Sequence, residues 1–152
     1  MICVIQRVNH CKVLINKELI SKINNGMLIF IGIESNDSKS DIEYIVKKTS
    51  NLRIFSDEKN EMNLSIKEIN GEILIVSQFT LCADMSKGRR PSFIKAAKPE
   101  KAKLFYENII DKFKDMKLNV KSGRFGGNMN VNISNDGPVT IIINSKDKNN
   151  EN

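Results

Sequence analysis

The chain has 152 residues, 40% of them hydrophobic and 28% charged, which is ordinary for one globular domain with a single core. No apolar run approaches the roughly 20 residues that cross a bilayer. The first residues also lack the basic leader and cleavage site of a signal peptide, so we expect a cytoplasmic protein without a membrane anchor. The net charge of +6 suits an RNA partner, but it is also common in proteins that bind no nucleic acid.

The first third of the chain is predicted to form strands. Residues 2–8 are expected to be one strand, and residues 12–15 and 18–23 a hairpin that turns at Asn16-Lys17. The run at 27–33 is apolar on both faces, which predicts a central strand of the sheet.

Two helices are predicted in the middle of the chain. Ser40-Asp41-Ile42-Glu43 matches a capping box, which predicts that the first helix begins at Ser40. Its apolar face has helical spacing and comprises Ile42, Ile45, Val46, Thr49 and Leu52. Pro99 suits the first turn of the second helix. The apolar stripe of that helix is interpreted as core and comprises Ala102, Phe105, Tyr106, Ile109, Phe113 and Met116.

Further strands are predicted at 73–76, 119–121, 130–134 and 139–143. Strands at both ends with two main helices between them predict a single-domain α+β fold. We expect mixed, largely antiparallel β-sheets packed into a barrel-like core. The domain is expected to span residues 1–145. From about Asn144 onward the chain has no apolar side chain, so residues 146–152 are predicted to be a disordered polar tail.

The residue types needed for conventional hydrolytic or metal chemistry are scarce. The three cysteines, Cys3, Cys11 and Cys82, are scattered and predict neither a disulfide framework nor a zinc site, so we expect them to fill space. The only histidine, His10, lies in an expected turn and is interpreted as a surface residue. Phosphate-binding glycine motifs and a GxSxG elbow are absent from the sequence. We therefore expect no metal and no cofactor, and a nucleophile activated by a protein base is poorly supported.

Three short stretches, taken together in this order and spacing, carry a family resemblance. They are Gln6-Arg7-Val8, then Ser77-Gln78-Phe79-Thr80-Leu81 followed by Lys87-Gly88-Arg89-Arg90-Pro91-Ser92-Phe93, and finally Met129-Asn130-Val131 through Asn135-Asp136-Gly137-Pro138-Val139-Thr140. Over about residues 1–145 the chain resembles the D-aminoacyl-tRNA deacylase family.

The resemblance implies a homodimer that hydrolyses the ester between a D-amino acid and the terminal adenosine of tRNA. It also implies removal of glycine from mischarged glycyl-tRNA(Ala). The implied catalytic wall is Ser77, Gln78, Phe79 and Thr80. A Gly137–cis-Pro138 unit from the partner subunit is implied to face this wall and to select the chirality of the substrate. Asn135, Val139 and Thr140 belong to the same implied motif, and Met129 is implied to lie near the terminal adenine.

Chemistry gives this implied site a rationale. An aminoacyl ester is already activated and its ribose 2′-hydroxyl can assist hydrolysis, so the protein needs mainly to orient the substrate and stabilise an oxyanion. Backbone N–H groups around Phe79 and Thr80 are candidates for that stabilisation. Thr80 itself has no evident base in the sequence, so we favour a pocket hydroxyl or a strand residue over a nucleophile.

Three further expectations concern charged residues and the alternative function. Lys87, Arg89 and Arg90 are the predicted phosphate contacts for tRNA, the alternatives being a solvated loop or, for the arginines, a brace at the dimer interface. Arg7 is expected to hydrogen-bond the Gly137-Pro138 carbonyls. The main alternative function is a nucleic-acid-binding module of the same fold without catalysis.

Overall fold

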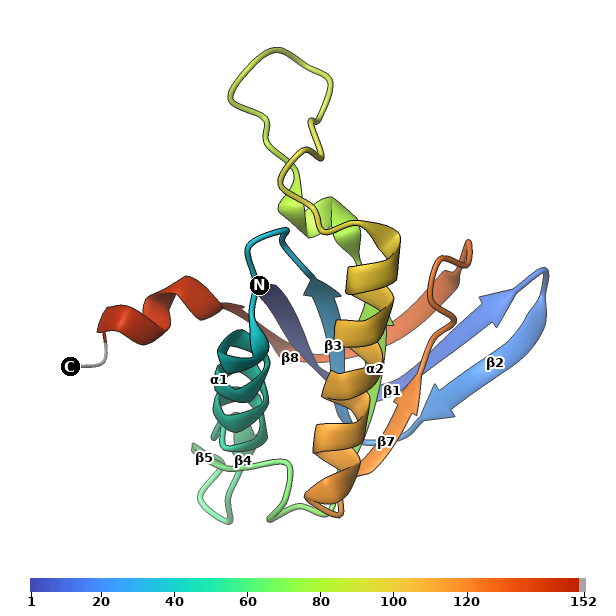
Figure 1. Ribbon diagram of the computed structural model, residues 1–152. Helices are drawn as coiled ribbons and strands as arrows, with labels where there is room; N and C mark the ends of the chain where they lie inside the picture. Colours follow the sequence, from blue (N-terminus) through green and yellow to red (C-terminus); the bar gives the residue numbers. More distant parts are fainter. Residues whose placement is uncertain (151–152) are drawn as a thin grey trace.

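A long first strand, β1 (Ile2–Ile15), organises the sheet of the computed structural model, which describes residues 1–150 (Figure 1). Along one side β1 pairs antiparallel with β8 (Asn130–Asn144) over nearly its whole length. On its other side it pairs antiparallel first with β3 (Gly26–Gly32) and then with β2 (Glu18–Ile23). A single strand therefore forms where the sequence predicted two.

The predicted turn at His10 is wrong. His10 lies inside β1 opposite Ser134 of β8, and the register of this pairing shifts between Val8 and His10. A β-bulge absorbs such an extra residue without ending the strand. The side chain of His10 is exposed, as predicted.

The other half of the sheet is parallel. Strand β6 (Glu72–Ser77) runs parallel to β3, and β7 (Asn119–Ser122) runs parallel to β6, giving the order β2-β1-β3-β6-β7 with β8 on β1. The Nζ of Lys121 on β7 donates a hydrogen bond of 2.7 Å to the carbonyl of Lys22 on β2, so the two ends of this order curl towards each other. The predicted α+β fold with a barrel-like mixed sheet and a central β3 is confirmed.

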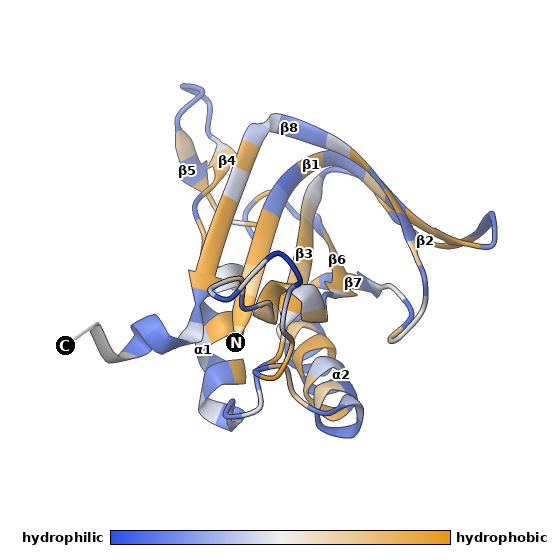
Figure 2. Ribbon diagram, turned by 90° about the horizontal axis from the view of Figure 1, so that it is seen from above, coloured by the Kyte–Doolittle hydropathy of each residue, from blue (hydrophilic) through white to orange (hydrophobic). Residues whose placement is uncertain are grey.

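Both helices, α1 (Lys39–Ser50) and α2 (Pro99–Asp115), pack on one face of the sheet (Figure 2). The start of α2 at Pro99 is as predicted. The predicted cap of α1 is wrong by two residues: the carboxylate of Asp41 accepts hydrogen bonds from the backbone N–H of Ser38 at 2.8 Å and from its hydroxyl at 2.7 Å. A small hairpin, β4 (Phe55–Ser56) with β5 (Met62–Leu64), follows α1.

The sheet has an apolar cluster on each face. The face under the helices holds the main core. The inside of the curl holds a smaller cluster, comprising Val8, Cys11, Val13, Ile23, Leu28, Leu74 and Val76. All three cysteines are buried and free, and burial raises the pKa of Cys3 to about 12, so it is a packing residue and not a reactive thiol.

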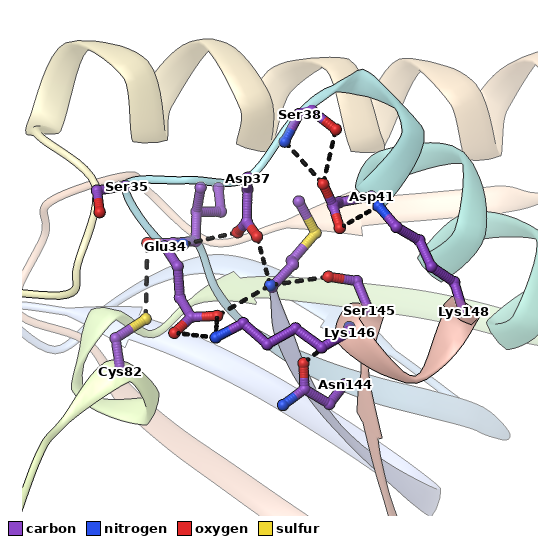
Figure 3. A network of polar contacts seen from close by, with 12 residues as sticks. Glu34, Ser35, Asp37, Ser38, Asp41, Cys82, Asn144, Ser145, Lys146 and Lys148 are labelled. Atoms are coloured by element: carbon purple, nitrogen blue, oxygen red, sulfur yellow. Dashed lines mark hydrogen bonds and ion pairs between the residues drawn. The ribbon is translucent and has the colours of Figure 1, made fainter. Parts of the chain in front are cut away.

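The N-terminus is buried in a network of polar contacts (Figure 3). The α-ammonium of Met1 lies 2.6 Å from Asp37 Oδ1 and 3.3 Å from Glu34 Oε2, and it donates a hydrogen bond of 2.9 Å to Ser145 Oγ. We call Met1, Glu34, Asp37 and Ser145 the terminal clasp, because they join the two ends of the domain. A buried charge is stable only when it is paired in this way.

The clasp changes the interpretation of the polar C-terminal residues. Ser145–Asn150 form the short 3₁₀ helix η2, in which Ser145 is fully buried. Lys146 Nζ lies 2.8 Å from Glu34, and Lys148 Nζ lies 2.8 Å from Asp41, so this segment is fixed by charge pairs and not by apolar packing. Residues 146 and 148 thus have defined contacts, while the disordered tail expected over residues 146–152 stays a prediction, and residues 151–152 lie outside the described part of the chain.

Candidate active site

A pocket of about 520 Å³ opens where β6 ends. Its walls are mostly apolar, and its polar side chains are Ser77, Gln78 and Asn128. None of the described lining residues has an acidic, basic or imidazole side chain. The pocket can therefore orient and desolvate a substrate, but its lining supplies no general acid or base of its own.

The polar wall continues β6 into the 3₁₀ helix η1 (Phe79–Cys82). The backbone N–H of Gln78 donates a hydrogen bond of 2.8 Å to the carbonyl of Ile31 and holds the wall against β3. Gly32 makes this packing possible, because a Cβ there would lie 2.9 Å from the Cβ of Leu81 and 3.1 Å from the carbonyl oxygen of Gln78. Sequence reasoning missed Gly32, although a glycine in an apolar strand signals such a close approach.

Thr80 lies in η1 and is exposed; it is not in a strand. The amide Nε2 of Gln78 donates a hydrogen bond to the Thr80 hydroxyl. Thr80 is not among the residues that line the pocket, and the described residues give its hydroxyl no recorded carboxylate, lysine or histidine partner. This geometry gives Thr80 no activating base, so its contact with Gln78 positions the wall.

Phe79 and Met129 form the apolar ends of the site. Phe79 is 58% exposed and makes an edge-on contact with Phe93, with the ring centroids 4.9 Å apart. Met129 lines the same pocket from the chain between β7 and β8. A Cβ on Gly123 would lie 2.6 Å from the Met129 sulfur, so Gly123 makes room for that side chain. The structure thus brings together Ser77, Gln78, Phe79 and Met129.

Gly137 and Pro138 lie elsewhere, in the middle of β8. The peptide bond between them is cis, and both residues are exposed. Neither lines the pocket of its own chain. Two other residues of the predicted motif have structural contacts. Val139 packs on the main core, and the Thr140 hydroxyl accepts a hydrogen bond of 3.3 Å from Gln6 Nε2.

Asn135 opens this stretch of β8 opposite Val8 of β1. Its side-chain oxygen is buried, and among residues 1–150 no hydrogen-bond partner is recorded for it. It does not line the pocket.

Arg7 makes contacts beside Gly137 that the sequence did not predict. Its Nη1 donates a hydrogen bond of 2.6 Å to the carbonyl of Ile54, and its Nε lies 2.9 Å from Asp136 Oδ2. The expected hydrogen bonds to the Gly137-Pro138 carbonyls are replaced by these contacts. Gly137 has φ +117°, and a Cβ there would lie 2.8 Å from Val139 Cγ2 and 3.2 Å from Arg7 Nη2, so only glycine fits without strain.

Lys87, Arg89 and Arg90 lie on the exposed loop that projects between η1 and α2 (Figure 1). Two backbone hydrogen bonds between Asp84 and Ser92, of 2.8 and 3.0 Å, close the base of this loop. Within the described chain no ion pair is recorded for any of the three cations, and none of them lines the pocket.

Residues 1–150 contain neither a metal-binding cluster nor a membrane-spanning helix. No group of three or more His, Cys, Asp or Glu side chains is placed to hold a metal ion. No helix in this range has the length and apolar character of a membrane span.

Proteins with this fold are found among solved structures. The c-Myc DNA unwinding element binding protein has a TM-score of 0.90 at 38% identity, covering 95% of this chain and 98% of that one. A probable eukaryotic D-amino acid tRNA deacylase has a TM-score of 0.83 over 93% and 97% of the two chains, and at 17% identity it shows the fold alone.

Sequence comparison identifies the family. The profile of the D-Tyr-tRNA(Tyr) deacylase family matches residues 4–144. A D-aminoacyl-tRNA deacylase of Thermosipho melanesiensis is 51% identical over 96% of this chain and 98% of its own length. That of Finegoldia magna is 55% identical over 93% and 96% of the two chains. The chain belongs to the D-Tyr-tRNA(Tyr) deacylase family.

Proposed function

We propose that this protein hydrolyses the ester bond of D-aminoacyl-tRNA in the cytoplasm and releases the D-amino acid and the tRNA. It removes glycine from mischarged glycyl-tRNA(Ala) by the same reaction. Family membership supports the reaction class. The observation that carries the mechanism is the pocket beside Ser77, Gln78 and Phe79, whose described lining has no titratable side chain.

Such a pocket suits a substrate that brings its own reactive group. In the proposed mechanism the 2′-hydroxyl of the terminal ribose assists the attack of water on the neighbouring ester carbonyl. The ester C–O bond breaks, the amino acid leaves as the free acid and the ribose hydroxyl is restored, and the enzyme contributes orientation. Charge on the carbonyl oxygen is stabilised by the backbone N–H of Phe79, which lines the pocket, since the first N–H groups of a helix have no partner inside it. Thr80 is not a nucleophile in this mechanism.

Chiral selection is assigned to Gly137 and Pro138 of a second copy in a homodimer. Both residues are exposed, and they lie outside the pocket of their own chain, so they are available to another copy. Their carbonyls would accept hydrogen bonds from the substrate ammonium, and the close backbone approach at glycine would leave no room for a side chain on the L side. Glycine has no side chain and passes this filter.

The projecting loop is assigned to tRNA binding. Lys87, Arg89 and Arg90 are exposed, without a recorded ion pair in the described chain, and flank a glycine with φ +78°. Cations in such a loop can contact phosphates, and neutralising one of them lowers the salt dependence of binding by about one unit of slope.

The test is parallel incubation with D-Tyr-tRNA and L-Tyr-tRNA, following the loss of each ester. The proposal expects loss of the D ester while the L ester decays at its spontaneous rate. Loss of both esters contradicts the chiral filter. Loss of neither contradicts the enzymatic function.

A nucleic-acid-binding function without catalysis is the second candidate. The observation that favours it is the 38% identity to a solved protein named for binding a DNA unwinding element. The discriminating result would be tight binding of DNA by a protein that leaves D-Tyr-tRNA intact. The open pocket beside Ser77 and Gln78 favours the enzyme, because binding alone does not require it.

A further inference from the structure

A second cavity, of about 720 Å³, adjoins the pocket and has a different character. Asn128, Met129 and Val131 line both cavities, so the two meet at the start of β8. The remainder of the second cavity is formed by the β1–β2 hairpin, which contributes Lys12 and Lys17, and by Asn130 and Asn132 of β8. No acidic residue is among its described lining residues.

The strand register aligns more cation and amide groups beside this cavity. Lys12 on β1 lies directly between Lys22 on β2 and Asn132 on β8, so the three side chains share one face of the sheet. Asn130 lies one step along the same face, opposite Leu14. We call the row of Lys12, Lys22, Asn130 and Asn132, together with Lys17, the hairpin face.

The hairpin face leaves its positive charge uncompensated. Directly opposed like charges destabilise an antiparallel pair, and Lys12 and Lys22 form such a pair. Within residues 1–150 no ion pair joins Lys12, Lys17 or Lys22 to a carboxylate, although lysines elsewhere, such as Lys146, have one. An anion bound across the hairpin face would remove this repulsion.

We infer that the hairpin face and its cavity bind the phosphodiester chain of the nucleotides that precede the terminal adenosine of tRNA. The inference rests on the proposed function, because it needs an aminoacyl-adenosine in the adjoining pocket. A terminal nucleoside beside Met129 puts the preceding phosphates next to the shared residues Asn128 and Val131, and the described cations nearest to them in the cavity lining are Lys12 and Lys17. The loop between η1 and α2 projects from another part of the molecule (Figure 1). In this arrangement the 3′ end of the tRNA runs from the pocket over the hairpin, and the loop contacts a more distant part of the tRNA.

The test compares three double variants of equal charge change. Lys12→Gln/Lys17→Gln removes two cations from the hairpin face. Arg89→Gln/Arg90→Gln removes two from the projecting loop. Lys47→Gln/Lys59→Gln is the matched control, because both of these lysines are exposed and lie on α1 and the β4–β5 turn, away from the pocket.

Each variant is assayed on D-Tyr-tRNA and on D-tyrosyl-adenosine, which has no phosphate. For Lys12→Gln/Lys17→Gln we expect KM for D-Tyr-tRNA to rise about tenfold at low salt with kcat unchanged, and the salt slope of log(kcat/KM) to fall by about 1.4, as for two contacts to a single strand. Its activity on D-tyrosyl-adenosine should equal that of the wild type. Arg89→Gln/Arg90→Gln should weaken use of tRNA without changing activity on a short acylated CCA trinucleotide, whereas the hairpin variant should be impaired on that trinucleotide as well.

Two results would overturn the inference: a hairpin variant that behaves like the control on D-Tyr-tRNA, or one that loses activity equally on D-tyrosyl-adenosine. The binding of uncharged tRNA by the same variants separates this inference from the proposed function. If the wild type hydrolyses neither substrate, the proposed function fails. Weaker tRNA binding by the hairpin variant alone would still support a nucleic-acid site on the hairpin face, and unchanged binding would contradict it.

Discussion

The terminal clasp and the pocket are neighbours that use polar groups in opposite ways. Ile33 lines the pocket, and Glu34, the next residue, belongs to the clasp. In the clasp the charges are buried and paired, whereas the pocket has only neutral polar side chains among its described lining. We therefore expect stability to depend on the clasp and catalysis on the pocket, so that the two properties respond to different changes.

The largest expected effect on catalysis comes from Gly137→Ala. The added Cβ would crowd Val139 and Arg7 at a positive φ, which displaces the segment assigned to chiral selection. A misplacement of about 1 Å at a positioning group costs roughly 100-fold, so kcat/KM on D-Tyr-tRNA should fall by about that factor.

Gly88→Ala is the matched control for this change. Gly88 also has a positive φ, of +78°, but a Cβ there would meet nothing within 4 Å. On D-tyrosyl-adenosine, which has no phosphate for the loop around Gly88 to contact, Gly88→Ala should cost little activity, whereas Gly137→Ala should still lose about 100-fold. Equal losses in Gly88→Ala and Gly137→Ala would show that backbone strain alone, and not the position of Gly137, causes the effect.

Glu34→Gln should have the largest effect on stability. It removes a buried carboxylate from Met1 and Lys146, and breaking a buried pair costs about 3 kcal/mol. Urea unfolding should show this loss, while kcat at 25 °C stays near the wild-type value. Glu107→Gln, which breaks an exposed pair with Lys103, should change the free energy of unfolding by less than about 0.5 kcal/mol. A large fall in kcat of the folded Glu34→Gln protein would contradict the separation of the two regions.

Glu34 of the clasp and the nearby Asp41 should also set the acid sensitivity of folding. Burial alone would raise the pKa of Glu34, but the hydrogen bond from Lys146 and the Met1 ammonium outweigh it and lower the pKa. Burial alone would also raise the pKa of Asp41, but the hydrogen bonds from Lys148, Ser145 and Ser38 outweigh it and lower that pKa.

A lowered folded-state pKa means that the unfolded chain binds more protons in acid. The stabilisation from Glu34 and Asp41 is complete above their ordinary values of 4.5 and 3.8 and is lost as the pH falls through the folded-state values. Unfolding free energies measured from pH 7 down to about pH 3 should therefore fall. The curve should be flatter for Glu34→Gln, and parallel curves would contradict this role.

The smallest expected effect is that of Thr80→Val. Its hydroxyl accepts one hydrogen bond from Gln78 at an exposed position, so kcat should fall by no more than about threefold. Single-turnover hydrolysis of D-Tyr-tRNA measures this directly. Near-total loss of activity in a folded Thr80→Val protein would assign Thr80 to the chemistry.

The sequence predicted the elements whose causes are local. The start of α2 followed from Pro99, and the central place of β3 followed from its apolar run. The cap of α1 was misplaced because both Asp41 and Glu43 suit a capping box, and only the folded backbone selects Asp41. The turn expected at His10 was wrong because β1 continues through that residue, where it pairs with β8.

The parts that could not be predicted depend on long-range contacts. The clasp joins Met1 to Ser145 across nearly the whole chain, and no local pattern marks it. The pocket wall at Ser77 and Gln78 was predicted from family resemblance. Gly32, which makes room for that wall, was missed although its place in an apolar strand signals a close approach, and Gly123, which makes room for Met129, became evident only from packing. The partners of Arg7 were mistaken because Ile54 lies far away in sequence.

The most direct test of the account uses D-Tyr-tRNA whose terminal ribose lacks the 2′-hydroxyl, with the spontaneous hydrolysis of each ester subtracted. A pocket without a titratable lining group needs that hydroxyl, so kcat should fall by about 100-fold or more, as for loss of a general catalytic group. Glu34→Gln should show the same ratio between the two substrates as the wild type. Equal enzymatic rates on the two substrates would contradict the account and would require a catalytic group from the protein.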